Sequence, residues 1–474
     1  MSTITRRGVS IGVTIVAAVA AYWLVRPVVP ELAARATGIL VLAAGFWATE
    51  ALPLFATAFV VIGLEIVLLA EVGGLAEQLT SLLVFLGVAV NGGSGGEEID
   101  AAQFLAPFAQ DIVILFLAGF FLSAAMAKHG VDRVLAARLL RPLAASPRRL
   151  IYGLLGLSAV FSMWMSNTAT AAMMLSLLNP LIADRPRGDR LSQSMILAVA
   201  FGANIGGLGT PIGTPPNAIA FGALNAAGYT VTFLSWMLVA VPLAAVLLVV
   251  CGLLLPRLLR PPDGGAMAFG IPEARQPLSW HGYATLAVLA VAMCLWITSG
   301  IHGVRPGAVG LLAVAALTAL GSLDQRDVNA IDWSILILMW GGLSLSIAVD
   351  ASGLAGVLAN ADVSALTGGL WLAALVTVLT AVTLSTVMSN TAAAALLVPM
   401  ALALSLPSGE QLAMLAALGC SLAMALPVST PPNAVAYATG RVELATMRRV
   451  GGLVSVICVV ILLLGYRLML PLIF

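Results

Sequence analysis

Residues 162–169 read Ser-Met-Trp-Met-Ser-Asn-Thr-Ala, and residues 385–392 read Ser-Thr-Val-Met-Ser-Asn-Thr-Ala. Each polar insertion interrupts a segment made mainly of alanine, leucine and valine. A second shared insertion, Thr-Pro-Pro-Asn-Ala, follows each of them, at residues 214–218 and 430–434. Matching helix breakers in the two halves of an apolar chain are typical of the binding site of a membrane transporter. The duplicated pattern therefore predicts the fold and the class of function together.

The composition excludes a water-soluble protein. Hydrophobic residues make up 61% of the 474 residues and charged residues 9%, whereas about 20 consecutive apolar residues span a bilayer. Uninterrupted runs of this kind lie near residues 9–28, 32–51, 53–72, 107–128, 232–256, 280–300, 304–322, 333–350 and 448–473. Four interrupted stretches lie at residues 151–183, 194–228, 371–406 and 411–440. We expect an all-α polytopic membrane protein.

The distribution of positive charge predicts the topology, because Lys and Arg in short loops stay on the cytoplasmic side. Six of them lie between Lys128 and Arg149, and three more follow residue 183. Residues 151–183 thus begin and end among cytoplasmic charges, and each arm of about 15 residues is too short to cross. We expect a re-entrant hairpin with Ser166, Asn167 and Thr168 at its tip.

The second copy has the opposite signature. Residues 351–440 contain no Lys or Arg, so the hairpin at 371–406 is expected to open to the outside. Two equivalent hairpins entering from opposite faces are what an inverted repeat produces.

The repeat extends beyond the hairpin tips. At a constant offset of 223 positions, Gly119, Ser123 and Gly130 recur as Gly342, Ser346 and Gly353. The long polar stretch rich in proline and arginine that starts at Arg257 divides the two copies. The expected organisation is an N-terminal transmembrane helix at 1–28, retained because no cleavage pattern follows it, a first repeat at 29–256, a cytoplasmic linker at 257–279 and a second repeat at 280–474.

The residues at the tips suit an anion and a cation at the same place. A helix that starts near Thr168 or Thr391 offers free backbone N–H groups and the positive end of its dipole to an anion. The preceding helix offers free carbonyls to a hard cation. Asn167 and Asn390 can face both, with the amide oxygen toward the cation and the NH2 group toward a carboxylate. The successive prolines break the segments 194–228 and 411–440 in the same way.

Several other classes of site are excluded. The four cysteines lack metal-binding or disulfide spacing, and the single lysine, Lys128, follows Ala127, so no Gly-Lys-Ser/Thr phosphate loop exists. No Ser/His/Asp arrangement is evident, so we expect no enzyme. Glu65 is the only ionisable residue deep in an apolar run, and a role in coupling or in structure stays open. Charges at run ends, such as Glu50, are expected to face lipid headgroups.

The paired motifs carry a family resemblance. Together with Trp47-Ala48-Thr49-Glu50-Ala51-Leu52-Pro53-Leu54, they resemble the divalent anion/sodium symporter family, to which the sodium-dicarboxylate transporters belong. The resemblance covers nearly the whole chain. It implies a homodimer in which each protomer has a scaffold domain and a transport domain that moves as an elevator and contains both hairpins and both broken helices.

The resemblance also implies which residues bind. One sodium site would use Ser162, Ser166, Asn167 and a carbonyl near Gly206, and the other Ser385, Ser389, Asn390 and a carbonyl near Pro427. The substrate carboxylates would contact Asn167, Thr168, Thr214, Asn390, Thr391, Thr430 and Pro431.

We therefore expect a transporter that imports C4 dicarboxylates such as succinate, malate and fumarate together with sodium. The expected location is a bacterial inner membrane with the amino terminus in the cytoplasm. The expected partners are the anion, Na⁺, the bilayer and a second copy of the chain, without nucleic acid or ATP. A sodium-independent dicarboxylate exchanger and a sodium/sulfate symporter of the same fold stay open, and an anion channel is disfavoured because the hairpins leave no continuous pore.

Overall fold

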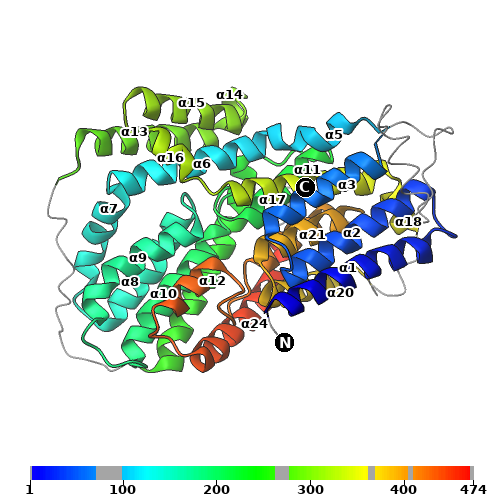
Figure 1. Cartoon of the computed structure of the whole chain (residues 1–474). Helices are drawn as coiled ribbons and strands as arrows, with labels where there is room; N and C mark the ends of the chain where they lie inside the picture. Colours follow the sequence, from blue (N-terminus) through cyan, green and yellow to red (C-terminus); the bar gives the residue numbers. More distant parts are fainter. Residues whose placement is uncertain (1–2, 71–98, 262–276, 361–368, 404–408, 470–474) are drawn as a thin grey trace.

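The computed structural model describes residues 3–70, 99–261, 277–360, 369–403 and 409–469 (Figure 1). Across these ranges the ordered elements are helices, apart from one isolated bridge between Ala70 and Ile99. Eight of the described helices are long and apolar enough to cross a membrane. The expected all-α membrane fold is confirmed.

The helices follow the interrupted pattern read from the sequence. After α1 (Thr3–Val25), the first half contains α2 (Glu31–Thr49), α3 (Leu54–Leu68), α5 (Ala101–Leu105), the 3₁₀ helix η1 (Ala106–Ala109), α6 (Asp111–Lys128), α7 (Val131–Leu140), the 3₁₀ helix η2 (Arg141–Leu143), α8 (Pro147–Ser162), α9 (Asn167–Ile182), α10 (Arg190–Gly207), α11 (Pro215–Ala226) and α12 (Phe233–Leu259). The second half contains α13 (Trp280–Ile297), α14 (Ser299–His302), α15 (Pro306–Ala319), α16 (Gln325–Asn329), α17 (Trp333–Ala351), α18 (Leu354–Asn360), α20 (Leu370–Val387), α21 (Asn390–Ala403), α22 (Gly409–Cys420), α23 (Pro431–Ala438) and α24 (Leu444–Met469).

Local geometry recurs between the halves. The starts of α7 and α18, of α8 and α20, and of α9 and α21 are each 223 positions apart. The turn before α7 uses Gly130 with φ of 66°, and the turn before α18 uses Gly353 with φ of 76°. Both values lie in the left-handed region that favours glycine.

A buried tryptophan marks the same corner in each half. The indole N–H of Trp47 donates to the carbonyl of Leu54 at 3.3 Å, and that of Trp296 donates to the carbonyl of Pro306 at 2.9 Å. Each bond ties the end of one helix (α2 or α13) to the start of the following long helix (α3 or α15). Both indoles are fully buried, so each donor needs this partner.

Helices of opposite halves pack against one another. The helices α2 and α3 lie against α17, whereas α13 and α15 lie against α6. Near the hairpins the contacts between the two halves are reciprocal: α9 of the first half contacts α23 of the second, and α21 of the second contacts α11 of the first. In Figure 1 the α13–α15 group lies at the upper left and the α1–α2 pair at the right, with α8, α9 and α10 at the lower left and α20 and α21 near α1 and α2 in this view. The centre of the fold is therefore built from both halves.

Some boundaries differ from the expected ones. The runs at 53–72 and 304–322 form only α3, of 15 residues, and α15, of 14 residues, each about 22 Å long. Proline explains where both helices start. Pro53 immediately precedes α3, and Pro306 is the first residue of α15. The N-cap residues, Pro53 and Arg305, both have extended backbones. The helix α12 continues to Leu259, beyond the expected boundary at 256. Residues 71–72, 262–276, 404–406 and 470–473 of the expected elements lie outside the described residues.

Candidate functional site

The first hairpin is formed by α8 and α9, which run to and from a four-residue turn at 163–166. The helix α9 begins at Asn167, one residue before the expected start at Thr168. Ser166 precedes it with an extended backbone, and its hydroxyl accepts from the N–H of Ala169 at 3.2 Å. Ser166 is thus an N-cap as well as a candidate ligand, because a serine oxygen has two acceptor positions.

Three oxygens converge beneath this tip. The hydroxyl of Ser162 lies within hydrogen-bonding distance of Oδ1 of Asn167 and, at 2.8 Å, of the carbonyl of Ala203 on α10. Ser162 is fully buried and Asn167 is 7% exposed. A hydroxyl has one proton and can donate to only one of the two neighbouring oxygens at a time. One acceptor oxygen of the cluster is therefore without this donor.

Glycine permits this close approach. A Cβ atom on Gly207 would lie 2.5 Å from Oδ1 of Asn167, and one on Gly206 would overlap the backbone of Ala159 on α8. The helix end at 206–207 can thus lie directly against the hairpin. The carbonyl of Gly206, a predicted sodium ligand, accepts from the N–H of Gly209 at 2.9 Å and retains a second acceptor position.

The second hairpin has a tighter tip. The helix α20 extends to Val387, so only Met388 and Ser389 separate it from α21. The hydroxyl of Ser385 donates to the carbonyl of Cys420, at the end of α22, at 2.6 Å. This bond repeats the one between Ser162 and Ala203. Each hairpin serine therefore contacts the broken helix of its own half.

A second pair of hydroxyl groups also bonds each hairpin tip to the broken helix of the same half. Thr210 Oγ1 donates to the carbonyl of Met163 at 2.5 Å, and Ser429 Oγ donates to that of Thr386 at 3.2 Å. Met163 and Thr386 occupy equivalent positions of the two hairpins. Sequence reasoning missed this role of Thr210 and Ser429, although hydroxyls in an apolar segment were a signal.

Asn217 holds the first break together. Its amide nitrogen lies 2.9, 3.1 and 2.8 Å from the carbonyls of Gly207, Leu208 and Thr210. These carbonyls lost helical partners at the break, which the amide partly replaces. The asparagine of the Thr-Pro-Pro-Asn insertion is therefore a structural clamp, which occupies one acceptor position on each of these three carbonyls.

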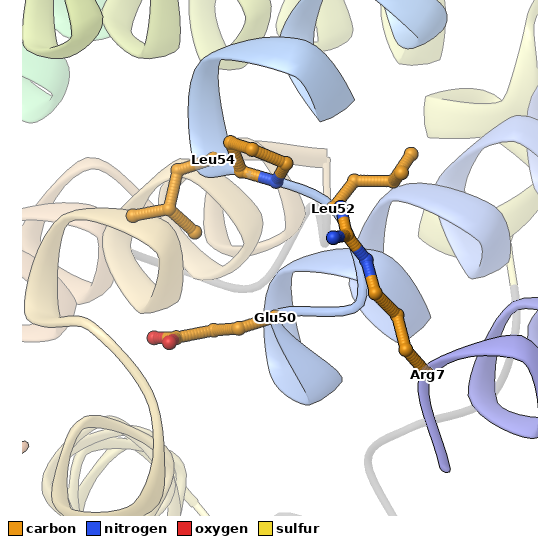
Figure 2. Close-up of a pocket in the computed structure, with 5 residues that line it drawn as sticks. Arg7, Glu50, Leu52 and Leu54 are labelled. Carbon is orange, nitrogen blue, oxygen red and sulfur yellow. The ribbon is translucent and has the colours of Figure 1, made fainter. Parts of the chain in front are cut away.

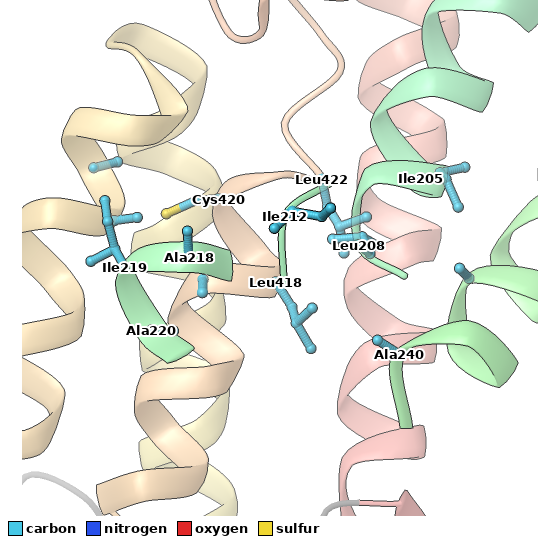
Figure 3. Packing of buried hydrophobic residues seen from close by; sticks show 14 of the residues in the cluster. Ile205, Leu208, Ile212, Ala218, Ile219, Ala220, Ala240, Leu418, Cys420 and Leu422 are labelled. Atoms are coloured by element: carbon cyan, nitrogen blue, oxygen red, sulfur yellow. The ribbon is translucent and has the colours of Figure 1, made fainter. Parts of the chain in front are cut away.

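The two breaks are bonded to each other. Asn204 on α10 donates through Nδ2 to Oδ1 of Asn433 on α23 at 3.1 Å, and Asn433 donates to the carbonyl of Leu426 at 3.1 Å. Asn204 is 1% exposed and Asn433 fully buried. Figure 3 shows the surrounding packing, where Ala218 and Ile219 of α11 lie near Leu418 and Cys420 of α22. Sequence reasoning did not single out Asn204.

Several buried oxygens nearby lack a hydrogen-bond partner among the described residues. They are Asn204 Oδ1, Asn217 Oδ1, Thr214 Oγ1, Thr430 Oγ1, Thr170 Oγ1, Ser158 Oγ and Ser421 Oγ. Thr214 and Thr430 stand at the N-cap positions of α11 and α23 without side-chain capping. The prolines that follow lack the N–H group that would otherwise donate at N2. Such unpartnered oxygens in a buried region are available to a ligand.

The two tips differ in exposure. Thr168 and Pro431 are exposed, whereas Asn390, Thr391 and Thr430 are buried. Ser389 and Pro427 are half-buried. The structure brings each tip together with its own break and both breaks together, while no hydrogen bond joins Asn167 to Asn390 among the described residues.

The ionisable residues considered earlier lie outside this cluster. Glu65 is fully buried between α3 and α17, where Ser344 donates to its Oε2. Glu50 is exposed beside a cavity of about 420 Å³ at the end of α2. Figure 2 shows Glu50 pointing away from Arg7, and Arg7 Nε donates to the carbonyl of Ala51 at 2.6 Å. Glu50 has φ of 48°, an uncommon conformation for a residue with a side chain.

Comparison with known proteins assigns the family. A sequence model described as citrate transporter matches residues 44–419. An uncharacterized transporter of Haemophilus influenzae is 32% identical over 397 residues, which cover 78% of this chain and 83% of that protein. The sodium-dependent dicarboxylate transporter SdcS of Staphylococcus saprophyticus is 29% identical, covering 92% of this chain and 86% of that one.

A solved structure supports the same fold. The crystal structure of the Alcanivorax borkumensis YdaH transporter superposes with a TM-score of 0.54 at 16% identity, covering 88% of this chain and 98% of that chain. The names of the family and its relatives denote a transporter and no enzyme, and the apolar helices agree with a membrane location. The chain belongs to the citrate transporter family, of the divalent anion/sodium symporter type, as its paired motifs indicated.

Proposed function

We propose that this protein is a secondary active transporter that imports C4 dicarboxylates together with sodium. The observation that carries the proposal is the cluster of Ser162, Asn167 and Ala203, in which one buried hydroxyl proton lies between two acceptor oxygens. A cation bound there would satisfy the second acceptor without a carboxylate ligand. The relatives named sodium-dependent dicarboxylate transporters support the same combination of cargo.

The proposed sodium sites lie one in each half. The first uses Ser162, Ser166, Asn167 and the carbonyl of Gly206, and the second uses Ser385, Ser389, Asn390 and the carbonyl of Pro427. The repeated contact from the hairpin serine to the neighbouring broken helix supports this assignment. Neutral oxygens suit Na⁺ because they release it more readily than a charged carboxylate would.

The proposed anion site lies at the starts of α9, α21, α11 and α23. It would use the side chains or backbones of Asn167, Thr168, Thr214, Asn390, Thr391, Thr430 and Pro431. The helix starts provide positive dipole ends, and the unpartnered hydroxyls of Thr214 and Thr430 provide donors that this fold does not otherwise use. Since these residues bear no positive charge, sodium would offset the charge of the dianion.

The proposed mechanism is an elevator motion in a homodimer in the bacterial inner membrane, with the amino terminus in the cytoplasm. Within the proposed repeats at 29–256 and 280–474, the hairpins and broken helices would move as one transport domain. The bonds from each hairpin to its break and between Asn204 and Asn433 support motion as a unit. Sodium would order the tips, so that substrate and sodium raise each other's affinity by the same factor.

The test is uptake of labelled succinate into liposomes that contain the purified protein. We expect uptake to require external sodium, and replacing Asn167 by Ala to lower it by about tenfold or more, the cost of a lost charge-assisted contact. Equal uptake with sodium and choline outside would exclude symport. A requirement for an internal dicarboxylate would indicate exchange, and competition by sulfate but not by malate would indicate an inorganic dianion.

Citrate is the second candidate substrate, because the matching family is described as a citrate transporter. A tricarboxylate has one more anionic group to accommodate than succinate. Unlabelled citrate and unlabelled malate, compared as competitors of labelled succinate at equal concentration and at a pH where both are ionised, distinguish these two substrates.

A further inference from the structure

A basic cavity lies away from the transport site, where α8 begins and α12 ends. It has a volume of about 700 Å³, and Arg148, Arg257 and Arg260 line it together with Tyr152 and Leu253. All three arginines are exposed. The proposed function gives none of them a role.

The electrostatics of this cavity favour an anion. Arg148 lies in the first turn of α8, a helix of 16 residues, where the helix dipole is already positive. Arg257 and Arg260 come from the last turn of α12 and the residue after it. Arg260 adopts φ of 48°, an uncommon conformation for a residue with a side chain. Three like charges gathered at one cavity are stabilised when an anion binds between them.

One wall of the cavity is apolar and exposed. Tyr152 is 45% exposed and Leu253 is 47% exposed, and Val249 one turn further along α12 is 62% exposed. The ring of Tyr152 lies against Gly252, since a Cβ there would be 3.3 Å from two ring carbons. This strip continues from the charged end toward the middle of the membrane-spanning helix α12. A free inorganic anion would leave it uncovered.

We propose that the cavity binds an anionic phospholipid, with its phosphate among Arg148, Arg257 and Arg260 and an acyl chain along Tyr152, Leu253 and Val249. Basic pockets between transmembrane helices on the cytoplasmic side recognise anionic headgroups. The positive charge of the segments that flank α8 and α12 assigns this end to the cytoplasmic leaflet. The lipid would hold the first arm of the cytoplasmic hairpin against α12.

The experiment measures the shift of the thermal unfolding midpoint of the detergent-purified protein. The additions are phosphatidylglycerol, phosphatidylcholine, inorganic phosphate and glycerophosphoglycerol, which is the headgroup without acyl chains. We expect a saturable stabilisation by phosphatidylglycerol alone. In the triple variant Arg148→Gln, Arg257→Gln, Arg260→Gln, the apparent affinity should fall on the order of 100-fold, since each arginine near an anionic lipid contributes about 1 kcal/mol.

The matched control is the triple variant Arg133→Gln, Arg138→Gln, Arg149→Gln, which removes the same charge from exposed positions on α7 and α8. It should keep the wild-type affinity. Equal loss in both variants would mean general attraction between the protein and anionic lipid, and would overturn the proposal. Stabilisation by phosphate or by the headgroup alone would mean that the cavity binds a free anion and not a lipid, which would overturn the proposal. If no addition stabilises the protein, the site is excluded. Size-exclusion chromatography of each variant establishes that it is folded.

Discussion

At the scale of single residues, asparagine has three separate roles in this protein. Asn167 lies in the oxygen-rich cluster under the first tip, Asn217 bonds three carbonyls of the first break, and Asn204 bonds Asn433 across the two halves. An amide can do this because it has two donors and a two-position acceptor without charge. In lipid, where broken backbone must find partners inside the protein, this versatility explains why asparagine recurs at the breaks.

Asn217→Ala should destabilise the protein without directly removing a predicted ligand. The carbonyls of Leu208 and Thr210 keep the indole of Trp236 and the N–H of Gly213 as donors, so the change leaves mainly the carbonyl of Gly207 unsatisfied, and a buried unsatisfied group costs about 1–3 kcal/mol. The measurement is the thermal unfolding midpoint in detergent. Asn329→Ala, at an exposed position of α16, is the control and should leave the midpoint unchanged. An unchanged midpoint for Asn217→Ala would show that the carbonyls find other partners.

Gly207→Ala should impair sodium binding more than folding. The new methyl group would come within 2.5 Å of Oδ1 of Asn167, the end of a side chain that can move aside. Moving it takes one oxygen out of the cluster with Ser162. We expect the sodium concentration for half-maximal uptake to rise about tenfold, as for loss of one good contact.

The control for Gly207→Ala is Gly156→Ala on α8, where a Cβ meets nothing within 4 Å. Its sodium dependence should match that of the wild type. If the wild type, Gly207→Ala and Gly156→Ala all show the same sodium dependence, Asn167 is not one of the sodium ligands.

At the scale of elements, the sequence predicts hairpins and breaks better than it predicts helix ends. Both hairpins and both broken helices occur where Ser-Asn-Thr and Thr-Pro-Pro-Asn interrupt the apolar segments, because chain breakers act locally. The end of α20 at Val387 agrees with the helix end expected near Met388. The end of α8 at Ser162, before the expected Met165, and the extension of α12 to Leu259 were not predictable, since tertiary packing decides how far a helix continues. The bond between Asn204 and Asn433 joins residues 229 positions apart, and no local pattern indicates it.

The turns before α7 and α18 allow a test of the repeat at this scale. Gly130→Ala and Gly353→Ala should each lower stability by about 1 kcal/mol, because both residues have left-handed φ and neither has a neighbour within 4 Å to clash. Thermal unfolding of the two variants should give similar shifts. If only one of them is destabilised, the turns are not equivalent in energy even though their geometry matches.

At the scale of the whole molecule, reciprocal packing makes one centre from two halves. Because α9 lies against α23 and α21 against α11, each hairpin packs on the broken helix of the other half, and the four elements form one packed unit. The exposure is nevertheless unequal, since Thr168 and Pro431 are open while Asn390 and Thr391 are buried. Under the proposed transport mechanism, one open tip and one closed tip are what one end state of an alternating-access cycle would present.

This asymmetry predicts which tip reacts with a water-soluble reagent. In a background with Cys294, the one exposed cysteine of the four, replaced by serine, Thr168→Cys should react rapidly with a membrane-impermeant maleimide in inside-out vesicles, and Thr391→Cys slowly. In right-side-out vesicles Thr168→Cys should be protected, because its tip faces the cytoplasm in the proposed orientation. Sodium with succinate should slow the labelling of Thr168→Cys, as ligands that order the tip reduce its access. Faster labelling from the outside would reverse the proposed orientation, and equal labelling of both tips would mean that the state with a single open tip is not the prevalent one in the membrane.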